Sequence, residues 1–326
     1  MAKSRAELFV SAGVVRKMAL EAPIHPTLDG VIEQAYVDHE AAKGPGWAPT
    51  SFHSKQFPGG VDVKHCGRQA LYKLMNFPTD GAFPPRAIAI MEAGQAVEEQ
   101  IIFRLGRTGT TIGGSEPIKR GQRSRQLKLE DPAVWLRGAM DAVLDGREIG
   151  VPYVVPVDIK TKDDRNLMGL VSGDKKVDAS YVGQVMSYIH MCRLHHFEMG
   201  WQEMGLEPSE GGLIYYASRA NPRTVYEEWV DWDPAYVEAG LARLAEWIQL
   251  FTNDELPPRD KTWRWTEEPC KWCDFKKVCR ADIKNDVVQL SRSTAVEQAK
   301  AVRRGYDPKA TQEKVIRTWE SKKEAK

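Results

Sequence analysis

The sequence predicts a mixed α/β fold in which helices flank one central sheet. Along the middle of the 326-residue chain, the expected order is helix, three or four strands, helix, two strands, helix. Such an order favours a mixed sheet with helices packed on its faces. With 42% hydrophobic and 28% charged residues, the composition is typical of a soluble globular protein with a packed core.

The helices expected before the sheet follow from apolar residues at helical spacing. This pattern covers the first stretch of the chain, to about residue 43, and a long segment over residues 85–105. Between them, glycine and proline at 44–46 and 57–60 interrupt regular structure. A short helix is expected directly after Cys66.

Four segments are predicted to be strands because they are rich in branched residues or alternate in polarity. They cover residues 108–112, 126–129, 138–144 and 153–161. The dipeptide Asp145-Gly146 predicts a tight hairpin turn between the last two strands.

The second half of the core continues with an exposed loop, because residues 163–178 are polar and contain glycine. A helix, two strands and a further helix are then expected over residues 181–194, 212–217, 224–229 and 234–250. After about Val288 the chain is highly charged, which predicts a solvated helical extension.

Charge and hydropathy restrict the setting of the protein. The longest apolar runs, such as residues 151–157, are too short to cross a bilayer, so no membrane association is expected. The first residues lack the apolar stretch of a secretory signal, which indicates a cytoplasmic protein. A formal net charge of +1 excludes an overall attraction to nucleic acid but allows a local basic groove.

Asp158 and Lys160 are candidate catalytic residues, since residues two apart on a strand point to the same face. If the strand that carries Asp141 pairs with theirs, the two carboxylates meet, repel each other and need a cation between them. Mg²⁺ takes such oxygen ligands, and a nearby lysine can act on the attacking water or the phosphate. The alternative is a surface ion pair; the apolar run 154–157 favours a buried strand with a functional end.

Two further pairs are candidates from helical spacing. Gln184 and Tyr188 are one turn apart on one helix face, where they could hold a phosphate or order a water; the alternative is a solvated amide and a half-buried ring. Glu98 or Glu99 could supply another carboxylate to a metal, although an exposed helical pair would look the same.

Four of the five cysteines form a pattern of one early cysteine and a cluster of three far downstream. Cys66 lies alone, and Cys270, Cys273 and Cys279 form a C-x2-C-x5-C cluster, whereas Cys192 lies in an apolar helix as a small core residue. In a reducing cytosol, clustered cysteines more often bind metal than form disulfides. Four thiolates fit zinc or an iron–sulfur cluster, and the spacing, with only one C-x2-C pair, favours the cluster.

Taken together, the motifs resemble those of the PD-(D/E)xK nuclease superfamily in its RecB-like branch. The residues that carry this resemblance are, in chain order, Glu98, Asp141, Asp158-x-Lys160 and Gln184-x3-Tyr188. With the cysteines added, the chain resembles the iron–sulfur RecB-family exonucleases, which include the Cas-four type of CRISPR systems, its phage relatives and the AddB nuclease domain. The resemblance covers roughly residues 64–280 and implies a restriction-endonuclease-like sheet.

The resemblance also implies roles. Asp141 and Asp158 would ligate Mg²⁺ or Mn²⁺ beside the Ile159 carbonyl, and Lys160 would be the catalytic lysine. Gln184-x3-Tyr188 would be the motif of this branch.

Two cofactor sites follow in the same way. Glu98 stands where many members of the family have a histidine metal ligand, and glutamate can also bind Mg²⁺ or Mn²⁺. A 4Fe–4S cluster would be held by four cysteines: Cys66, Cys270, Cys273 and Cys279. The implied division of the chain is an N-terminal helical region 1–65, a nuclease core 66–260, a cysteine segment 261–285 and a charged tail 286–326.

The expected function is metal-dependent DNA exonuclease activity, with single-stranded ends as substrate, in recombination, repair or CRISPR adaptation. The alternative is a non-cleaving DNA-binding or assembly subunit with a structural iron–sulfur or zinc site. The intact Asp141, Asp158 and Lys160 favour the enzyme. A homo-oligomer is compatible with the resemblance, because ring-like assemblies occur among such relatives.

Overall fold

The computed structural model describes residues 51–59, 65–74, 85–113, 126–253, 255–257, 266, 269–276 and 279. The expected N-terminal helices and the charged tail lie outside these residues. The chain divides into two compact units, Met1–Gly44 with Phe83–Ala89, and Pro45–Ala82 with Ile90–Lys326. Apart from the first residues of helix α4, every described element belongs to the second unit.

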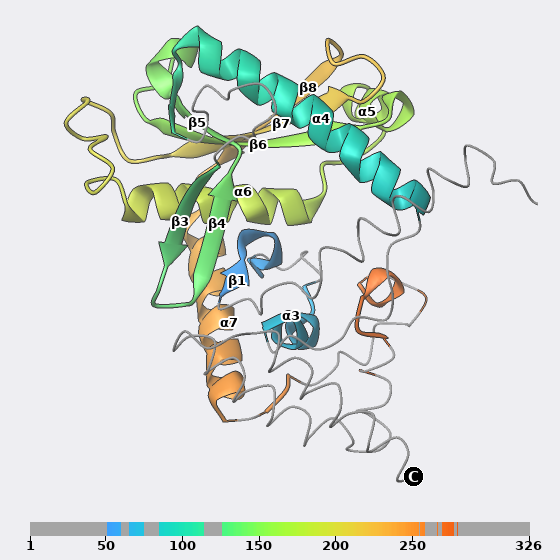
Figure 1. Ribbon diagram of the computed structural model, residues 1–326. Helices are drawn as coiled ribbons and strands as arrows, with labels where there is room; N and C mark the ends of the chain where they lie inside the picture. The colour runs from blue at the N-terminus through green and yellow to red at the C-terminus, as the bar shows by residue number, and fades with distance from the viewer. Residues whose placement is uncertain are drawn as a thin grey trace, which may run out of the picture. The chain divides into compact units, whose positions relative to one another are not determined.

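A five-stranded mixed sheet forms the centre of this unit (Figure 1). Its strand order is β2-β5-β6-β7-β8, in which β6 and β7 are parallel and the other neighbours antiparallel. The strands are β2 (Thr111–Gly113), β5 (Ala142–Asp145), β6 (Val154–Lys162), β7 (Gly211–Ser218) and β8 (Val225–Asp231).

A second, three-stranded sheet has the order β1-β4-β3. It consists of β1 (Phe52–His53), β4 (Leu136–Met140) and β3 (Leu127–Asp131). The expectation of one central sheet is therefore wrong. The predicted strand 138–144 is broken at Asp141, where the chain leaves one sheet and enters the other.

Helices cover both faces of the five-stranded sheet. On one face, Ile101 and Ile102 of α4 (Pro85–Thr108) share a hydrophobic cluster with Val157 and Ile159 of β6. Because neighbouring residues of a strand point to opposite faces, Asp158 and Lys160 are turned the other way. On that side lies α6 (Ala179–Leu194), and its Tyr181 ring contacts Lys160. Figure 1 shows the sheet between these two helices.

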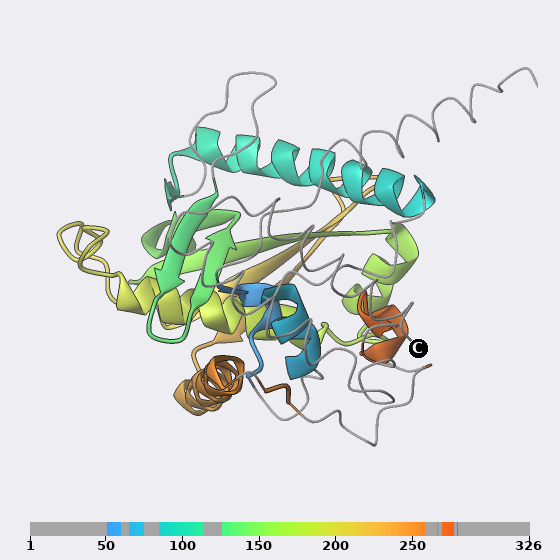
Figure 2. The same ribbon diagram turned by 60° about the horizontal axis from the view of Figure 1, so that its bottom comes forward.

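Side-chain contacts also join the cysteine segment to the helix after Cys66. This helix is α3 (Gly67–Leu74), and the segment begins with the 3-10 turn η3 (Cys270–Trp272). The Tyr72 and Phe275 ring centroids are 5.6 Å apart, and Lys73 Nζ lies 3.9 Å from Asp274 Oδ2. Both ribbon views place the two elements side by side (Figure 2).

Two local expectations are wrong. Residues 163–178 are not only a loop, because α5 (Asp164–Val171) forms there. The Asp163 carboxylate accepts the Asn166 N–H at the helix start, and Leu167 and Leu170 are buried.

The connection between β5 and β6 is also longer than a two-residue turn. It contains the 3-10 turn η2 (Gly146–Ile149), which Asp145 caps by accepting the Arg147 N–H. Gly150 then reverses the chain at a φ of 87°, a left-handed conformation that favours glycine. The antiparallel pairing of the two strands nevertheless occurs as expected.

The mixed α/β architecture with helix-flanked sheets is thus confirmed. The last described helix, α7 (Pro234–Thr252), packs beside residues 51–59, with Arg243 Nη1 donating to the Pro58 carbonyl at 3.2 Å. None of the helices in the described part of the chain combines the length and apolarity needed to cross a membrane.

The contact of α7 with residues 51–59 gives a stability prediction. A Cβ at Gly240 would lie 2.4 Å from Cζ of the buried Phe57 ring, so Gly240→Ala should lower the free energy of unfolding by about 1–3 kcal/mol through overpacking. In an open helix the same change stabilises by up to ~1 kcal/mol. Gly169→Ala in α5 is the matched control, because its new methyl group meets only the flexible Lys175 side chain. Urea unfolding of both variants measures the difference; equal effects would contradict this packing.

Candidate active site

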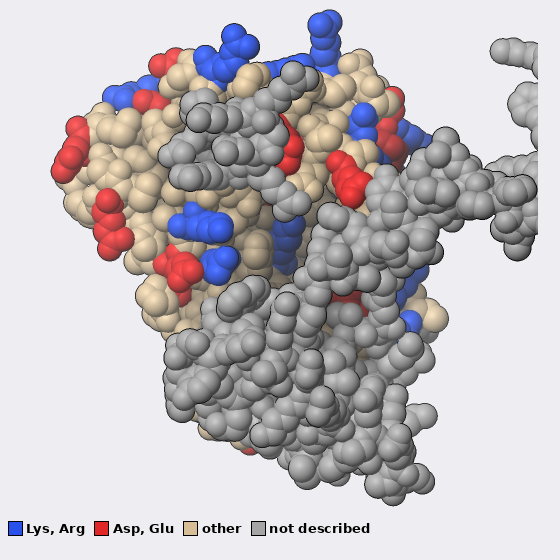
Figure 3. All heavy atoms as spheres, in the orientation of Figure 1, with Lys and Arg blue, Asp and Glu red and all other residues tan. Residues whose placement is uncertain are grey.

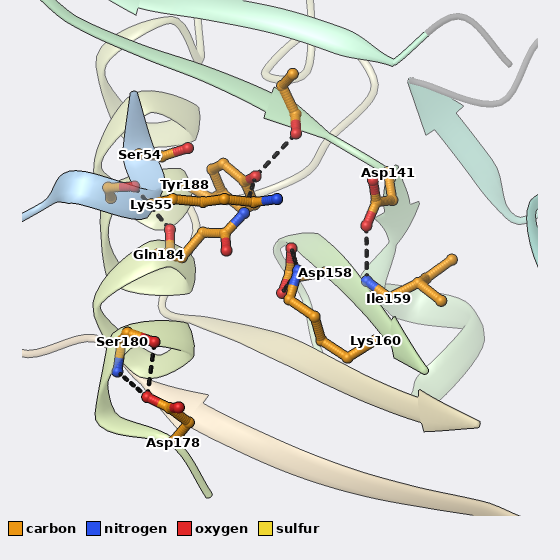
Figure 4. Close-up of polar contacts among 12 residues, drawn as sticks. Ser54, Lys55, Asp141, Asp158, Ile159, Lys160, Asp178, Ser180, Gln184 and Tyr188 are labelled. Atoms are coloured by element: carbon orange, nitrogen blue, oxygen red, sulfur yellow. Dashed lines mark hydrogen bonds and ion pairs between the residues drawn. The ribbon is translucent and has the colours of Figure 1, made fainter. Parts of the chain in front are cut away.

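Asp141 is fixed at the junction of the two sheets. Its Oδ2 accepts the Ile159 backbone N–H at 2.7 Å, and its Oδ1 accepts from Gln126 Nε2 at 2.6 Å. The side chain is only 5% exposed. Because Ile159 follows Asp158 directly on β6, this bond holds the Asp141 carboxylate near Asp158, directly before the start of β5 (Figure 4).

Asp158 and Lys160 form a buried ion pair on the α6 side of β6. Lys160 Nζ lies 2.7 Å from Oδ1 and 2.6 Å from Oδ2 of Asp158, which is 1% exposed. Burial raises the pKa of Asp158 to about 6; the Lys160 ammonium opposes this shift and the charge of Asp141 adds to it. Burial disfavours the Lys160 ammonium, but the Asp158 and Asp141 carboxylates outweigh it and raise the pKa of Lys160.

Glu98 supplies a third carboxyl group from α4. Burial raises its pKa to about 8, and the neighbouring charge of Asp141, with which it shares a hydrogen bond, adds to the shift. Glu99 instead accepts from Gln95 Nε2 at 3.4 Å on the exposed side of the helix. Of the two glutamates, Glu98 is therefore the one that approaches the aspartates.

Gln184 and Tyr188 are buried together rather than presented to solvent, at 2% and 1% exposure. Gln184 Nε2 donates to the Tyr188 hydroxyl at 2.6 Å, and the hydroxyl donates to the Ala139 carbonyl at 2.8 Å. Burial raises the pKa of Tyr188 well above its usual value, so the hydroxyl stays protonated. The pair thus holds the backbone of β4 two residues before Asp141.

The carboxylates fit a hard divalent cation by their chemistry. The high pKa values of Glu98 and Asp158 mean that the site resists holding three negative charges, which oxygen-bound Mg²⁺ or Mn²⁺ would compensate. Within the described ranges, however, no group of three or more His, Cys, Asp or Glu side chains has metal-binding geometry. The Ile159 carbonyl was expected to be a metal ligand. The backbone N–H of the same residue donates to the Asp141 carboxylate.

The four candidate cysteine ligands approach one another between α3 and the segment after α7. The Cys66 sulfur accepts backbone N–H groups at the start of α3; burial raises its pKa, and the Cys270 thiol adds to the shift. Burial also raises the pKa of Cys273 to about 11, with Cys66 and Cys279 adding to it. None of these cysteines forms a disulfide among the residues that the structure describes. Cys192 is buried in α6, as predicted for a core residue.

Three residues near the carboxylates were not singled out from the sequence. Gln126 binds Asp141 from the start of β3, and the Tyr181 ring lies 5.0 Å from Lys160 Nζ. Lys55, in the 3-10 turn η1 (Ser54–Gln56), projects toward the same place (Figure 4). Only Tyr181 carried a signal, since it lies one turn before Gln184 on α6.

Comparison with solved structures gives low similarity. SSO0001 is 15% identical, with 78% of this chain and 97% of that chain covered and a TM-score of 0.38. The alkaline exonuclease LHK-Exo of Laribacter hongkongensis is 12% identical, with 63% and 94% covered and a TM-score of 0.37. Its complex with dAMP is 13% identical, with the same coverage and a TM-score of 0.38. Likenesses at this level carry no argument about activity.

Comparison with protein families is more informative. No protein of curated function matches the chain in sequence. The family model of the PD-(D/E)XK nuclease superfamily matches residues 71–280, which include all the carboxylate and lysine candidates and three of the four cysteines. The RecB-like iron–sulfur branch stays a prediction. Because the match covers well over half of the chain, the protein belongs to the PD-(D/E)XK nuclease superfamily.

Proposed function

We propose that the protein is a metal-dependent deoxyribonuclease that hydrolyses phosphodiester bonds as an exonuclease on single-stranded ends. The observation that carries this proposal is the proximity of Asp141, Asp158 and the Lys160 amine on β6, with Glu98 of α4 beside Asp141. Membership of a nuclease superfamily gives that cluster its chemical meaning. The preference for single-stranded ends, and a place in recombination, repair or CRISPR adaptation, follow from the resemblance to RecB-like exonucleases.

Glu98, Asp141 and Asp158 would hold Mg²⁺ or Mn²⁺, with the Ile159 carbonyl beside them. When bound, such a cation supplies positive charge that stabilises the charge developing on the phosphoryl oxygens. The bonds from Ile159 N–H and Gln126 to Asp141 orient that carboxylate before any ligand arrives. Such preorganisation lowers the cost of reaching the transition state.

Lys160 would act on the attacking water. Its raised pKa keeps the amine protonated at neutral pH, so it donates hydrogen bonds rather than removing a proton. The ion pair with Asp158 and the Tyr181 ring, 5.0 Å away, restrict where that amine can lie. A fixed ammonium can orient the water and stabilise negative charge on the phosphate.

Gln184 and Tyr188 would be positioning residues. They were expected to contact the phosphate or a water, but their burial supports a role through the backbone of β4. By holding the Ala139 carbonyl, Tyr188 fixes the strand end that carries Asp141. The active-site carboxylate would then depend on a hydrogen bond made from α6.

The four cysteines would hold a 4Fe–4S cluster that fastens the segment after α7 to α3. The Cys270 thiol adds to the raised pKa of Cys66, and Cys66 and Cys279 add to that of Cys273, which supports a shared centre. Thiolate ligands suit both this cluster and zinc. The cluster would have a structural role, because it would join the same two elements that the Tyr72–Phe275 contact joins.

Cleavage is the direct test. Purified protein with Mn²⁺ or Mg²⁺ should shorten end-labelled single-stranded DNA, and EDTA should stop the reaction. Asp158→Asn and Lys160→Met should each lower the rate by at least about a hundredfold, the scale of losing one electrostatic group. Lys128→Met, an exposed lysine on β3, should cut normally.

Substrates blocked at the 5′ or the 3′ end separate digestion from the two ends. Wild-type protein that binds DNA but releases no product with either metal would identify a non-cleaving subunit instead. Full activity of Lys160→Met in a folded protein would remove this residue from the site.

Proton binding by Glu98 predicts opposite effects of pH on stability and metal affinity. In EDTA, unfolded Glu98 ionises near its ordinary pKa of 4.5 while the folded group stays protonated to about 8, so the melting temperature should fall as pH rises between these values. Metal affinity should rise over the same range, because the ligands must lose protons.

Glu98→Gln should flatten the melting profile and weaken Mn²⁺ binding in calorimetric titration, whereas Glu99→Gln should change neither. Because Glu98 and Glu99 are adjacent on the same helix, a general destabilisation of α4 would affect both variants. A change in Glu98→Gln alone therefore reports the local role of Glu98. Identical pH profiles for wild-type protein and Glu98→Gln would contradict the placement of Glu98 beside Asp141.

Metal analysis tests the cysteine centre. Anaerobically purified protein should contain about four iron atoms with the visible absorption of an iron–sulfur cluster. Cys66→Ala and Cys273→Ala should lose that iron, whereas Cys192→Ala should retain it. Stoichiometric zinc without iron would identify the alternative four-thiolate site.

A further inference from the structure

The segment 51–59 is held rigidly against the core on both sides of one exposed lysine. Phe52 pairs in β1 with Leu136 of β4, and its N–H donates to the Trp135 carbonyl at 2.6 Å. Ser54 and Phe57 are fully buried, while Lys55 between them is exposed. The direction in which Lys55 leaves the backbone is therefore fixed by its neighbours.

Local hydrogen bonds tighten the 3-10 turn that carries this lysine. Gln56 Oε1 accepts the His53 N–H at 3.0 Å, and His53 Nδ1 accepts the Lys55 N–H at 3.2 Å. Ser54 lies close enough to Tyr188 to affect the pKa of its hydroxyl, and that hydroxyl holds the Ala139 carbonyl. The turn that carries Lys55 and the strand end before Asp141 thus both lie beside Tyr188.

The Lys55 amine enters the space bounded by Tyr188, Asp158 and Asp141 (Figure 4). Among the residues that the structure describes, it has no hydrogen bond or ion pair. Its charge nevertheless reaches the site, since it helps to lower the pKa of Asp158 against the effect of burial. Lys160 differs, because its amine is already bound to both oxygens of Asp158.

The net charge of the site with a bound divalent cation explains why a second amine is needed when phosphate binds. Three carboxylates, one divalent cation and the Lys160 ammonium together carry no net charge. A phosphate that entered would bring a negative charge into a partly desolvated site, where an unpaired charge is costly. One further cation restores the balance, and Lys55 is the described lysine whose free amine already faces that space.

We propose that Lys55 binds a non-bridging oxygen of the scissile phosphate, opposite the three carboxylates. This inference rests on the proposed nuclease function and deepens it by naming the residue that recognises the substrate anion. A protonated amine is a strong donor to phosphate oxygen, and the rigid turn limits the entropy lost when it binds.

The surroundings make such a single contact important. On the face drawn in Figure 3, basic and acidic side chains of the described residues are interspersed, without a continuous basic surface. Lys55 would supply one defined cationic contact at the reacting phosphate.

Binding without metal provides a readout apart from catalysis. In an Asp158→Asn background with EDTA, fluorescence anisotropy should show that Lys55→Ala weakens binding of single-stranded DNA about tenfold, which is ~1.4 kcal/mol. The salt dependence should become shallower by ~0.7 in slope, the value for one lost phosphate contact on a single strand. Lys55→Arg should keep most of the affinity, and Lys128→Ala is the matched exposed-lysine control.

Replacing one charged phosphate linkage with an uncharged methylphosphonate tests which phosphate the Lys55 amine binds. Oligonucleotides with one methylphosphonate, placed at the first linkage from either end, should bind the parent protein more weakly but bind Lys55→Ala with no further loss. Additive losses would place Lys55 on another phosphate and overturn the assignment. Equal affinities of the parent and Lys55→Ala, or a parent that binds no DNA, would overturn it too.

Cleavage by otherwise wild-type protein separates this inference from the proposed function. If wild-type protein cuts DNA with Mn²⁺ and Lys55→Ala cuts with unchanged kcat/KM, the nuclease stands and the role of Lys55 fails. If wild-type protein does not cut but the anisotropy results hold, the nuclease proposal fails while Lys55 remains an anion-binding residue.

Discussion

The hydrogen bond from the Ile159 N–H to the Asp141 carboxylate is the constraint on which the site depends. It forms where the chain passes from the three-stranded sheet into the five-stranded one, between β4 and β5. A hydrogen bond to a charged group contributes about 1.5–3 kcal/mol, enough to hold a side chain beside a like charge. The antiparallel register, in which Ala142 pairs with Val157, brings Asp141 next to Asp158, and the hydrogen bond fixes where the Asp141 carboxylate lies.

The carboxyl groups lie close together, and their proximity makes Glu98 and Asp158 harder to ionise. The Asp158 carboxylate retains its charge through Lys160, and Glu98 responds to burial and to Asp141 by holding its proton more tightly. The metal-free site therefore carries less negative charge than three carboxylates would suggest. A divalent cation gains affinity only after displacing that proton, which links occupancy of the site to pH.

The sequence predicted the parts of this site that depend on local periodicity. Alternation along β6 gave the common face of Asp158 and Lys160, and helical spacing gave the common face of Gln184 and Tyr188. The break at Asp141 was not predictable, because it depends on a hydrogen bond to a strand formed later in the chain. Helix α5 was missed because its Asp163 cap and its buried Leu167 lie in a polar, glycine-containing stretch. Gln126 and Lys55 reach the site only through tertiary packing, which no local pattern records.

Tyr188 connects the two halves of the proposed machinery. Its hydroxyl donates to the Ala139 carbonyl, ahead of Asp141, and Ser54, next to Lys55, lies close enough to affect its pKa. The carboxylate that would hold the cation and the amine that would hold the phosphate therefore both lie near one residue of α6. This arrangement gives a physical reason for a glutamine and a tyrosine, four residues apart, to be buried together beside Asp158.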